Sequence, residues 1–324
     1  MILHSRPVKS GIRFLSSKPF PGYKGVSWYA VTEFFIRWID TKDMQIRASS
    51  LSFTFFLALF PSAIFVFTLI AYLPFGHAHE DILKFFSQIL PPSAYQTIES
   101  TLQDILKKQH GGLLSLGFLS AMYFSTNGFV SLMNALNRYG KQKERRSFWK
   151  QRLVALILSL VVSFSLLISV VMVTVGNFLI DFFDRLKYFP SRVTPALLFL
   201  LNYTVVAAII LTIVSSVYYF APSHNKRSKW KFFSPGSLFA CIIILLTTMG
   251  FSYYVNQFDS YNKVYGSIGV LIVIMLLIYI NTYILLLGYE FNVAIDKTAQ
   301  EIKTGGNIKA NRIIVLRESA QRES

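Results

Sequence analysis

The sequence has little charge and almost no cysteine. Its 324 residues include one cysteine, Cys241, so an intramolecular disulfide or a metal cluster held by several thiolates is excluded. Only 15% of the residues are charged, whereas an average soluble domain has roughly 25%. Acidic residues are the scarcer kind, with 16 Asp and Glu against 32 Lys and Arg. A soluble domain of this length would need more polar side chains to cover its surface.

The residue patterns of common enzyme sites are also missing. The sequence contains no Gly-rich phosphate loop, no serine nucleophile elbow and no His-Glu-x-x-His pattern. His77 and His79 stand beside Glu80 and Asp81, but nothing else gathers with them, and a solvated loop is the simpler interpretation. We therefore expect no enzyme activity, no catalytic residues, no cofactor and no bound metal.

Long apolar runs are what the sequence does have, and 53% of its residues are hydrophobic. Six stretches without Asp, Glu, Lys or Arg exceed the about 20 residues that a helix needs to cross a bilayer. We predict an all-α membrane protein whose bundle of six transmembrane helices occupies residues 48–294. The predicted spans are about 48–75, 111–137, 153–180, 195–221, 232–258 and 265–290.

The orientation follows from the positive charge, because Lys and Arg resist translocation. Most of the 32 basic residues lie before Ala48, in Arg138–Arg152, in Lys226–Lys231 and after Tyr289, and all four segments fall on one side of the membrane. We predict that this side is cytoplasmic and that both termini lie there, in a bacterial plasma membrane. The same pattern favours anionic lipid headgroups as partners and argues against nucleic acid.

Segments outside the spans show amphipathic patterns. In the cytoplasmic region 1–47, Trp28, Val31, Phe35 and Trp38 recur at helical spacing and predict a helix lying on the inner leaflet. The loop between spans one and two shows two short amphipathic patterns separated by Pro91 and Pro92, which predict interfacial helices or a lid over a cavity. Residues 295–324 are predicted to be a polar cytoplasmic tail.

A line of polar residues runs along span two. Ser120, Asn127, Ser131, Asn134 and Arg138 recur at intervals of three, four and seven, which places them on one helical face. An amide exposed to lipid is costly, so this face should point into the bundle. It either holds helices together by hydrogen bonds or lines a pathway.

Span six carries a carboxylate, Glu290, near its predicted inner end. Tyr279 and Tyr283 lie about whole turns away on the same stripe, as does Tyr265. These residues could form a proton or cation relay, or Glu290 could be an anchor paired with a basic loop residue such as Arg146. In span one, Pro61 should kink the helix and is a candidate hinge.

Four stretches of the chain resemble one known family. The sequence is similar to the YihY/virulence factor BrkB family of bacterial inner-membrane proteins, once mislabelled as ribonuclease BN. The stretches are Arg47-Ala48-Ser49-Ser50-Leu51-Ser52-Phe53 with Leu59-Phe60-Pro61; Asn134-Ala135-Leu136-Asn137-Arg138-Tyr139 with Glu144-Arg145-Arg146-Ser147-Phe148-Trp149; Ala221-Pro222, Lys229-Trp230-Lys231 and Ser234-Pro235-Gly236-Ser237; and Tyr265-Gly266-Ser267-Ile268-Gly269 with Gly288-Tyr289-Glu290-Phe291-Asn292.

The sequence departs from the family pattern at two positions. Leu277 stands where the family usually has Trp, and Tyr289 stands where it usually has Ala beside the glutamate. The resemblance implies a transporter-like protein that exports a lipid or another amphiphile. The candidate intramembrane pathway is then Asn127, Ser131, Asn134, Tyr279, Tyr283 and Glu290. The alternative is a membrane scaffold of the cell envelope that binds a second copy of the chain or another protein through cytoplasmic-loop contacts at Arg138, Arg145, Arg146 and Trp149.

Overall fold

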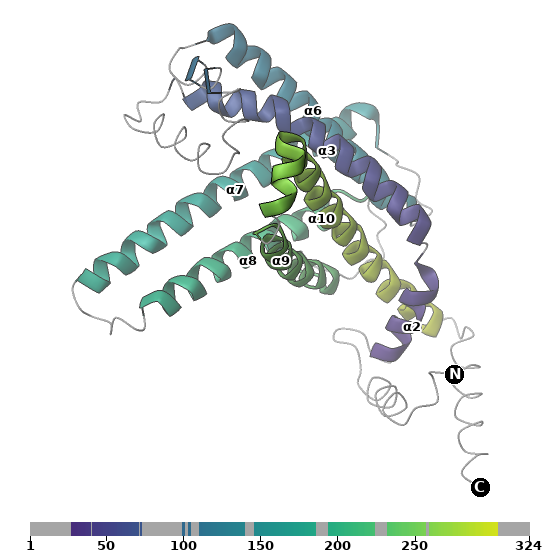
Figure 1. The fold of residues 1–324 in the computed structure, drawn as a ribbon. Helices are drawn as coiled ribbons and strands as arrows, with labels where there is room; N and C mark the ends of the chain where they lie inside the picture. Colours follow the sequence, from purple (N-terminus) through teal and green to yellow (C-terminus); the bar gives the residue numbers. More distant parts are fainter. Residues whose placement is uncertain are drawn as a thin grey trace.

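The computed structural model describes residues 27–39, 41–70, 72, 99–100, 103–104, 110–139, 146–185, 194–223, 232–256 and 259–303. Every regular element in this part of the chain is an α-helix, which confirms the predicted all-α class (Figure 1). The helices are α2 (Trp28–Trp38), α3 (Thr41–Ile70), α6 (Gly111–Tyr139), α7 (Phe148–Arg185), α8 (Thr194–Phe220), α9 (Pro235–Asn256) and α10 (Asp259–Lys303).

Five of these helices, α3, α6, α7, α8 and α10, are long and apolar enough to cross a bilayer. Helix α9 adds a shorter apolar segment, Pro235–Phe251, among the residues described. The helices therefore fit a protein that crosses the membrane several times, while the count of six spans and the cytoplasmic termini remain predictions. The short helices predicted around Pro91 and Pro92 lie outside the described residues, as do residues 1–26 and 304–324.

Helices α3, α7 and α10 extend five or more residues past an end predicted for their spans. Helix α3 begins at Thr41 rather than Ala48, and α10 runs on to Lys303 instead of ending near Glu290. The spans were bounded by charged residues, but a helix continues past a charge wherever protein is available to pack against it. As a consequence, both Arg47 and Glu290 lie inside helices rather than at their ends.

The extension of α10 is covered by α2 (Figure 1). Ser27 caps the start of α2 by accepting a hydrogen bond from the Ala30 amide, at 3.2 Å. Val31 is fully buried against Ile295 and Ala299 of α10. The predicted amphipathic helix is therefore present, and α10 covers at least part of its apolar face.

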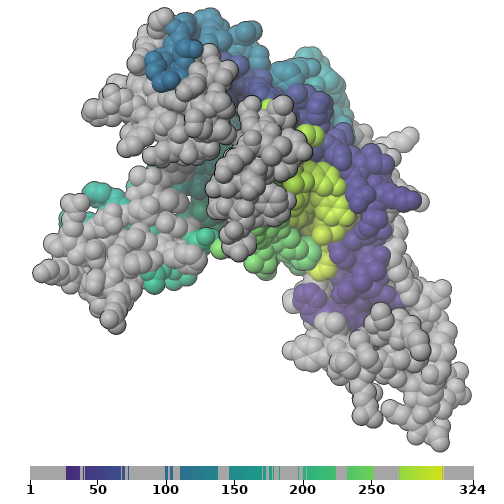
Figure 2. All heavy atoms as spheres, in the orientation of Figure 1, coloured from purple at the N-terminus to yellow at the C-terminus, as the bar shows by residue number. Residues whose placement is uncertain are grey.

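Helices α3 and α6 lie side by side for much of their length (Figure 1). Glycines of α6 allow the close approach, because a Cβ on Gly128 would lie 3.0 Å from the Phe55 ring and one on Gly117 would lie 3.2 Å from the Phe65 backbone. Helix α10 packs against α3, as the yellow and purple atoms of Figure 2 show.

Helices α7 and α8 form a hairpin that diverges from the α3–α6 pair (Figure 1). Near its start α7 belongs to the core, since Ala155 and Leu158 are completely buried. Farther along, the consecutive residues Leu166, Leu167 and Ile168 are each more than half exposed, at 55%, 61% and 51%. Three successive residues point in directions about 100° apart around a helix, so more than half of the circumference of α7 is exposed there.

Candidate functional site

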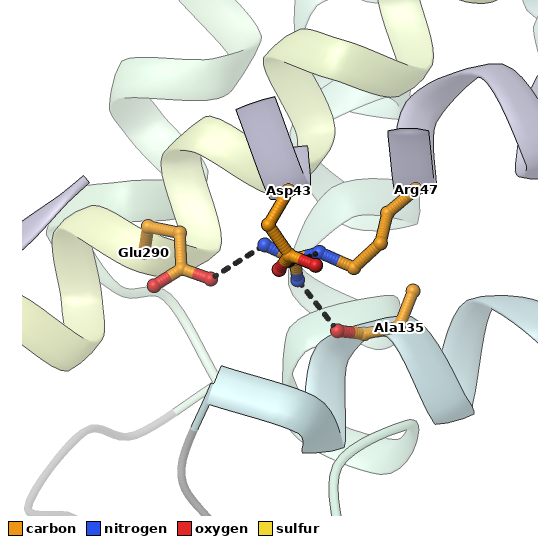
Figure 3. Close-up of polar contacts among 4 residues, drawn as sticks. All are labelled: Asp43, Arg47, Ala135 and Glu290. Atoms are coloured by element: carbon orange, nitrogen blue, oxygen red, sulfur yellow. Dashed lines mark hydrogen bonds and ion pairs between the residues drawn. The ribbon is translucent and has the colours of Figure 1, made fainter. Parts of the chain in front are cut away.

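A buried ion pair joins α3 to α10 (Figure 3). Nη2 of Arg47 lies 3.7 Å from Oε1 of Glu290, and these side chains are only 5% and 1% exposed. Nε of Arg47 also lies 3.0 Å from Oδ2 of Asp43, one turn earlier on α3. We refer to Asp43, Arg47 and Glu290 as the buried charge cluster. Glu290 was predicted as a candidate site residue, and its partner is Arg47.

The buried charge cluster also holds α6. Nη1 of Arg47 donates a hydrogen bond of 2.8 Å to the backbone carbonyl oxygen of Ala135 (Figure 3). A guanidinium carries its N–H donors in a planar fork, so one cation can serve three acceptors in different directions. Taking charges out of water costs several kcal/mol per ion, roughly, and good geometry with further hydrogen bonds is needed to offset it. Arg47 thus connects three helices through one group.

One carboxylate oxygen of this cluster can still accept a hydrogen bond. Oε2 of Glu290 is buried and accepts no hydrogen bond from the part of the chain that is described. Buried polar atoms are nearly always hydrogen-bonded, so an exception calls for an explanation. A carboxylate oxygen of this kind can take up a proton or accept a hydrogen bond from another donor.

The tyrosines predicted on the stripe of Glu290 lie about three and two turns before it on α10. The rings of Tyr279 and Tyr283 are 6.3 Å apart and pack against the main core. Tyr289, the residue that departs from the family pattern, stacks obliquely on Tyr218 of α8 at 5.6 Å. The hydroxyl of Tyr218 donates to the Leu285 carbonyl oxygen at 2.6 Å, which ties α8 to α10.

Two residues of the polar line of α6 hydrogen-bond to α7, and one of them, Asn134, is exposed although this face was predicted to point into the bundle. The amide oxygen of Asn134 accepts a hydrogen bond of 2.7 Å from Gln151, and that of Asn127 accepts one of 3.3 Å from Arg152. Ser131, between them, is partly buried. The structure therefore separates the predicted pathway into two parts, with Asn127 and Asn134 against α7 and Glu290 against α3.

The structure describes the side chains of only two of the four predicted cytoplasmic-loop residues, Arg146 and Trp149. Arg146 donates to the carbonyl oxygens of Ala221 and Phe220 at 3.0 and 3.1 Å, and to that of Pro222, so it binds the C-terminal end of α8. The last carbonyls of a helix lack partners within it, and a cation there is favourable. Trp149 is 78% exposed. Arg145 and the side chain of Arg138 lie outside the described residues.

The four stretches that carry the family resemblance contact one another. Arg47 links the first to Ala135 in the second and to Glu290 in the fourth. Arg146 in the second binds Ala221 in the third. Asn292 in the fourth accepts a hydrogen bond of 2.7 Å from the Gly236 amide and donates one of 2.8 Å to Ser234, both in the third. Residues far apart in the sequence thus form one connected region.

Close backbone contact completes this region. A Cβ on Gly288 of α10 would lie 2.7 Å from the Gly236 carbonyl oxygen and 2.5 Å from the Tyr218 hydroxyl oxygen. A Cβ on Gly236 of α9 would in turn overlap the Gly288 carbonyl oxygen. Positions 236 and 288 therefore both require glycine for α9 to approach α10.

Helix α3 continues through Pro61, which removes one backbone donor, while the neighbouring Ser62 hydroxyl donates to the Ala58 carbonyl at 2.7 Å. A hinge at Pro61 remains a prediction.

Sequence reasoning missed Asp43, Arg47 and Arg152 as site residues. Asp43 and Arg47 are spaced four apart, a helical salt-bridge spacing, but they preceded the predicted start of the first span. Arg152 likewise directly precedes the predicted third span. A search for charges just outside the spans would have found all three residues.

Comparison with known proteins identifies relatives over most of the chain. The model of a family described as "Virulence factor BrkB" matches residues 35–312. A "Putative ribonuclease-like protein YfkH" of Bacillus subtilis is 33% identical over 257 residues, which cover 78% of this chain and 90% of the relative. A "UPF0761 membrane protein" of Alteromonas mediterranea is 23% identical over 278 residues, covering 83% of this chain and 88% of the relative. No solved structure matches.

Proposed function

This chain belongs to the virulence factor BrkB family, and on that premise we propose that it transports a lipid or another amphiphile across the bacterial plasma membrane. The observation that carries the proposal is the buried charge cluster. Glu290 lies within the apolar segment Leu271–Gln300, where a charged side chain is costly, and such residues in membrane helices generally serve a function. Stability alone does not require the pair, because apolar residues often replace buried ion pairs without loss.

The cluster offers a way to couple a local change to helix movement. Arg47 holds α10 through Glu290 and α6 through the Ala135 carbonyl. Oε2 of Glu290 can take up a proton or accept a hydrogen bond from another group. Either event weakens the attraction between Glu290 and Arg47, and with it the contact between α10 and α3. We propose that transport uses this step. Since no ATP-binding pattern occurs in the sequence, the energy would come from an ion gradient, a substrate gradient or a partner protein.

An amphiphile fits the exposed helix surfaces. Leu116, Leu119 and Tyr123 of α6 are 64%, 57% and 57% exposed, and the outer part of α7 is exposed on most sides. In a membrane these surfaces contact acyl chains. The polar line of α6 lies beside them and supplies Asn127 and Asn134 for a headgroup, so a substrate with polar and apolar parts would find both.

The proposal is tested with purified protein in liposomes that carry a fluorescent phospholipid. Wild-type protein should move the lipid between leaflets faster than protein-free liposomes do. Glu290→Gln and Asn127→Leu should abolish this movement while inserting normally. Asp296→Asn, on the same helix and outside the cluster, is the matched control and should keep the wild-type rate. If Glu290→Gln and Asn127→Leu both retain the full rate, the pathway idea fails.

A scaffold is the second candidate, and one observation favours it. Phe148 and Trp149 are 62% and 78% exposed at the start of α7, beside a basic loop. Exposed aromatic side chains of this kind anchor protein interfaces, although they also sit at lipid headgroups. A photocrosslinker placed at Trp149 in cells should capture a second copy of the chain or an envelope protein if the scaffold exists. Capture of lipid alone would count against it.

We do not extend the word "ribonuclease-like" from the Bacillus relative to this chain. Phosphodiester cleavage would need a nucleophile or metal ligands, and among the described residues no three His, Cys, Asp or Glu side chains gather to hold an ion. We propose that the protein is not an enzyme and that its basic face binds anionic lipid rather than nucleic acid. RNA cleavage by purified protein, lost in a point variant, would refute this.

A further inference from the structure

Arg152 is a second cation on the membrane helices, and its surroundings differ from those of Arg47. Its guanidinium donates one hydrogen bond, to Asn127 at 3.3 Å, and lies over the rings of Tyr123 and Phe148 at 5.9 and 5.5 Å. A guanidinium has five N–H donors. Within the described part of the chain no carboxylate pairs with Arg152, so a cation with unused donors lies against two aromatic rings.

The surface beside Arg152 is apolar and open. Residues at intervals of four, four, three and four form a single stripe along α7, and they are 46% to 78% exposed. This α7 stripe consists of Trp149, Leu153, Ile157, Leu160 and Phe164. Its centre lies about a quarter turn around the helix from Arg152. Tyr123 of α6 borders Arg152 from the neighbouring helix and is 57% exposed.

We propose that Arg152 binds the phosphate of an anionic phospholipid whose acyl chains lie along the α7 stripe. Guanidinium and phosphate form strong, charge-assisted hydrogen bonds. Arg152 comes directly before the apolar run Leu153–Ile180, so its side chain stands at headgroup depth, where Trp149 is also favoured.

Charge selects the class of lipid. The chain has a net charge of +16, and the segment Arg138–Arg152, which leads into this end of α7, has seven Lys and Arg against one acidic residue. A zwitterionic headgroup carries an ammonium group beside its phosphate and would add positive charge to this basic surface, whereas an anionic headgroup would not. A basic residue at the surface attracts anionic lipid by about 1 kcal/mol, which corresponds to a preference of roughly fivefold. The inference names a lipid class for the proposed transporter and rests on that function only for its biological use, because binding can be measured without transport.

The test uses Trp149 as the reporter. The full chain has four tryptophans, and replacing Trp28, Trp38 and Trp230 by Phe leaves Trp149 alone. This parent protein is reconstituted in phosphatidylcholine with increasing fractions of brominated phosphatidylglycerol, or of brominated phosphatidylcholine as the reference arm. Fluorescence quenching then gives the relative association of the two lipids with the α7 stripe.

The parent should prefer phosphatidylglycerol about fivefold, and Arg152→Gln should remove the preference. Arg152→Lys, which keeps the charge, should retain most of it. Lys150→Gln is the matched control, because it removes the same charge from the other side of the α7 stripe, and it should lower the preference less than Arg152→Gln does. Arg152→Met, which keeps the apolar stem, serves as the second neutral variant and should behave as Arg152→Gln does.

Three results would overturn the inference. One is an unchanged preference in both neutral variants of Arg152, another is an equal loss in Lys150→Gln, which would indicate a general surface effect, and the third is a parent protein without any preference. A preference that depends on Arg152 in a protein that moves no lipid would support this site and refute the transporter. Lipid movement by a protein without any preference would support the transporter and refute this site.

Discussion

Arg47→Met removes the cation of the buried charge cluster while keeping much of the side-chain volume. We expect this variant to lose about 3–5 kcal/mol of stability, because removing one partner leaves the other charge buried and uncompensated. Glu290 is 1% exposed, so water cannot replace the lost partner without opening the contact between α3 and α10. Asp43 would also lose its neighbour at 3.0 Å.

The magnitude follows from the geometry. At 3.7 Å and an effective permittivity of about 20, the attraction between Arg47 and Glu290 is about 4.5 kcal/mol before the cost of desolvation is counted. Glu290→Gln should cost less than Arg47→Met, since Arg47 keeps Asp43 and the Ala135 carbonyl as partners. The double variant Arg47→Met/Glu290→Gln should recover part of the loss, because no unpaired charge remains at position 290.

The assay is unfolding in mild detergent by added sodium dodecyl sulfate, followed by tryptophan fluorescence, for the wild type, both single variants and the double variant. The double-mutant cycle gives the interaction energy of the pair. We expect it to be about 2–4 kcal/mol, smaller than the bare attraction because of desolvation. Strict additivity of the two single effects would show that Arg47 and Glu290 do not interact and would refute the reasoning.

Three further predictions concern packing, capping and topology. Gly288→Ala should destabilise the protein by about 1–3 kcal/mol in the same assay, because the added Cβ would overlap α8 and α9. Gly250→Ala is the control and should be neutral or stabilising, because a Cβ there would have nothing within 4 Å. Equal effects of the two substitutions would contradict the close approach of the helices at Gly288. Arg146→Gln should cost about 1–3 kcal/mol through the lost hydrogen bonds to the end of α8, and full stability would show that those bonds contribute nothing. Alkaline phosphatase fused after Tyr139 should be inactive and a fluorescent protein at the same point should be bright, since the positive charge predicts a cytoplasmic position; an active phosphatase would reverse the topology.

Hydrophobicity alone predicted much of the fold. A run without charges is the direct signature of a helix in lipid, so the predicted spans overlap six of the helices in the structure, including α9. The ends were less accurate because packing decides them. Arg47 lies within α3 where its charge is matched by Asp43 and Glu290, and α10 continues past Glu290 where Val31 of α2 covers it.

The candidate site was only partly predictable. Glu290 stood out because an isolated carboxylate near a span needs a reason. Its partner could not be chosen from the sequence, since more than one basic residue stands near the same end of the spans and the choice depends on which helices touch. Arg146 was a reasonable candidate by position, yet it binds the end of α8. Likewise, periodicity placed Asn127 and Asn134 on one face of α6 but could not show that α7 lies against it.

The measurement that tests the account most directly is lipid movement by Arg47→Met/Glu290→Gln in liposomes, compared with its own stability. If the charges drive transport, the double variant should be more stable than Arg47→Met and still move no lipid. If the double variant regains both stability and lipid movement, the cluster only holds helices together, and its proposed role in transport is wrong.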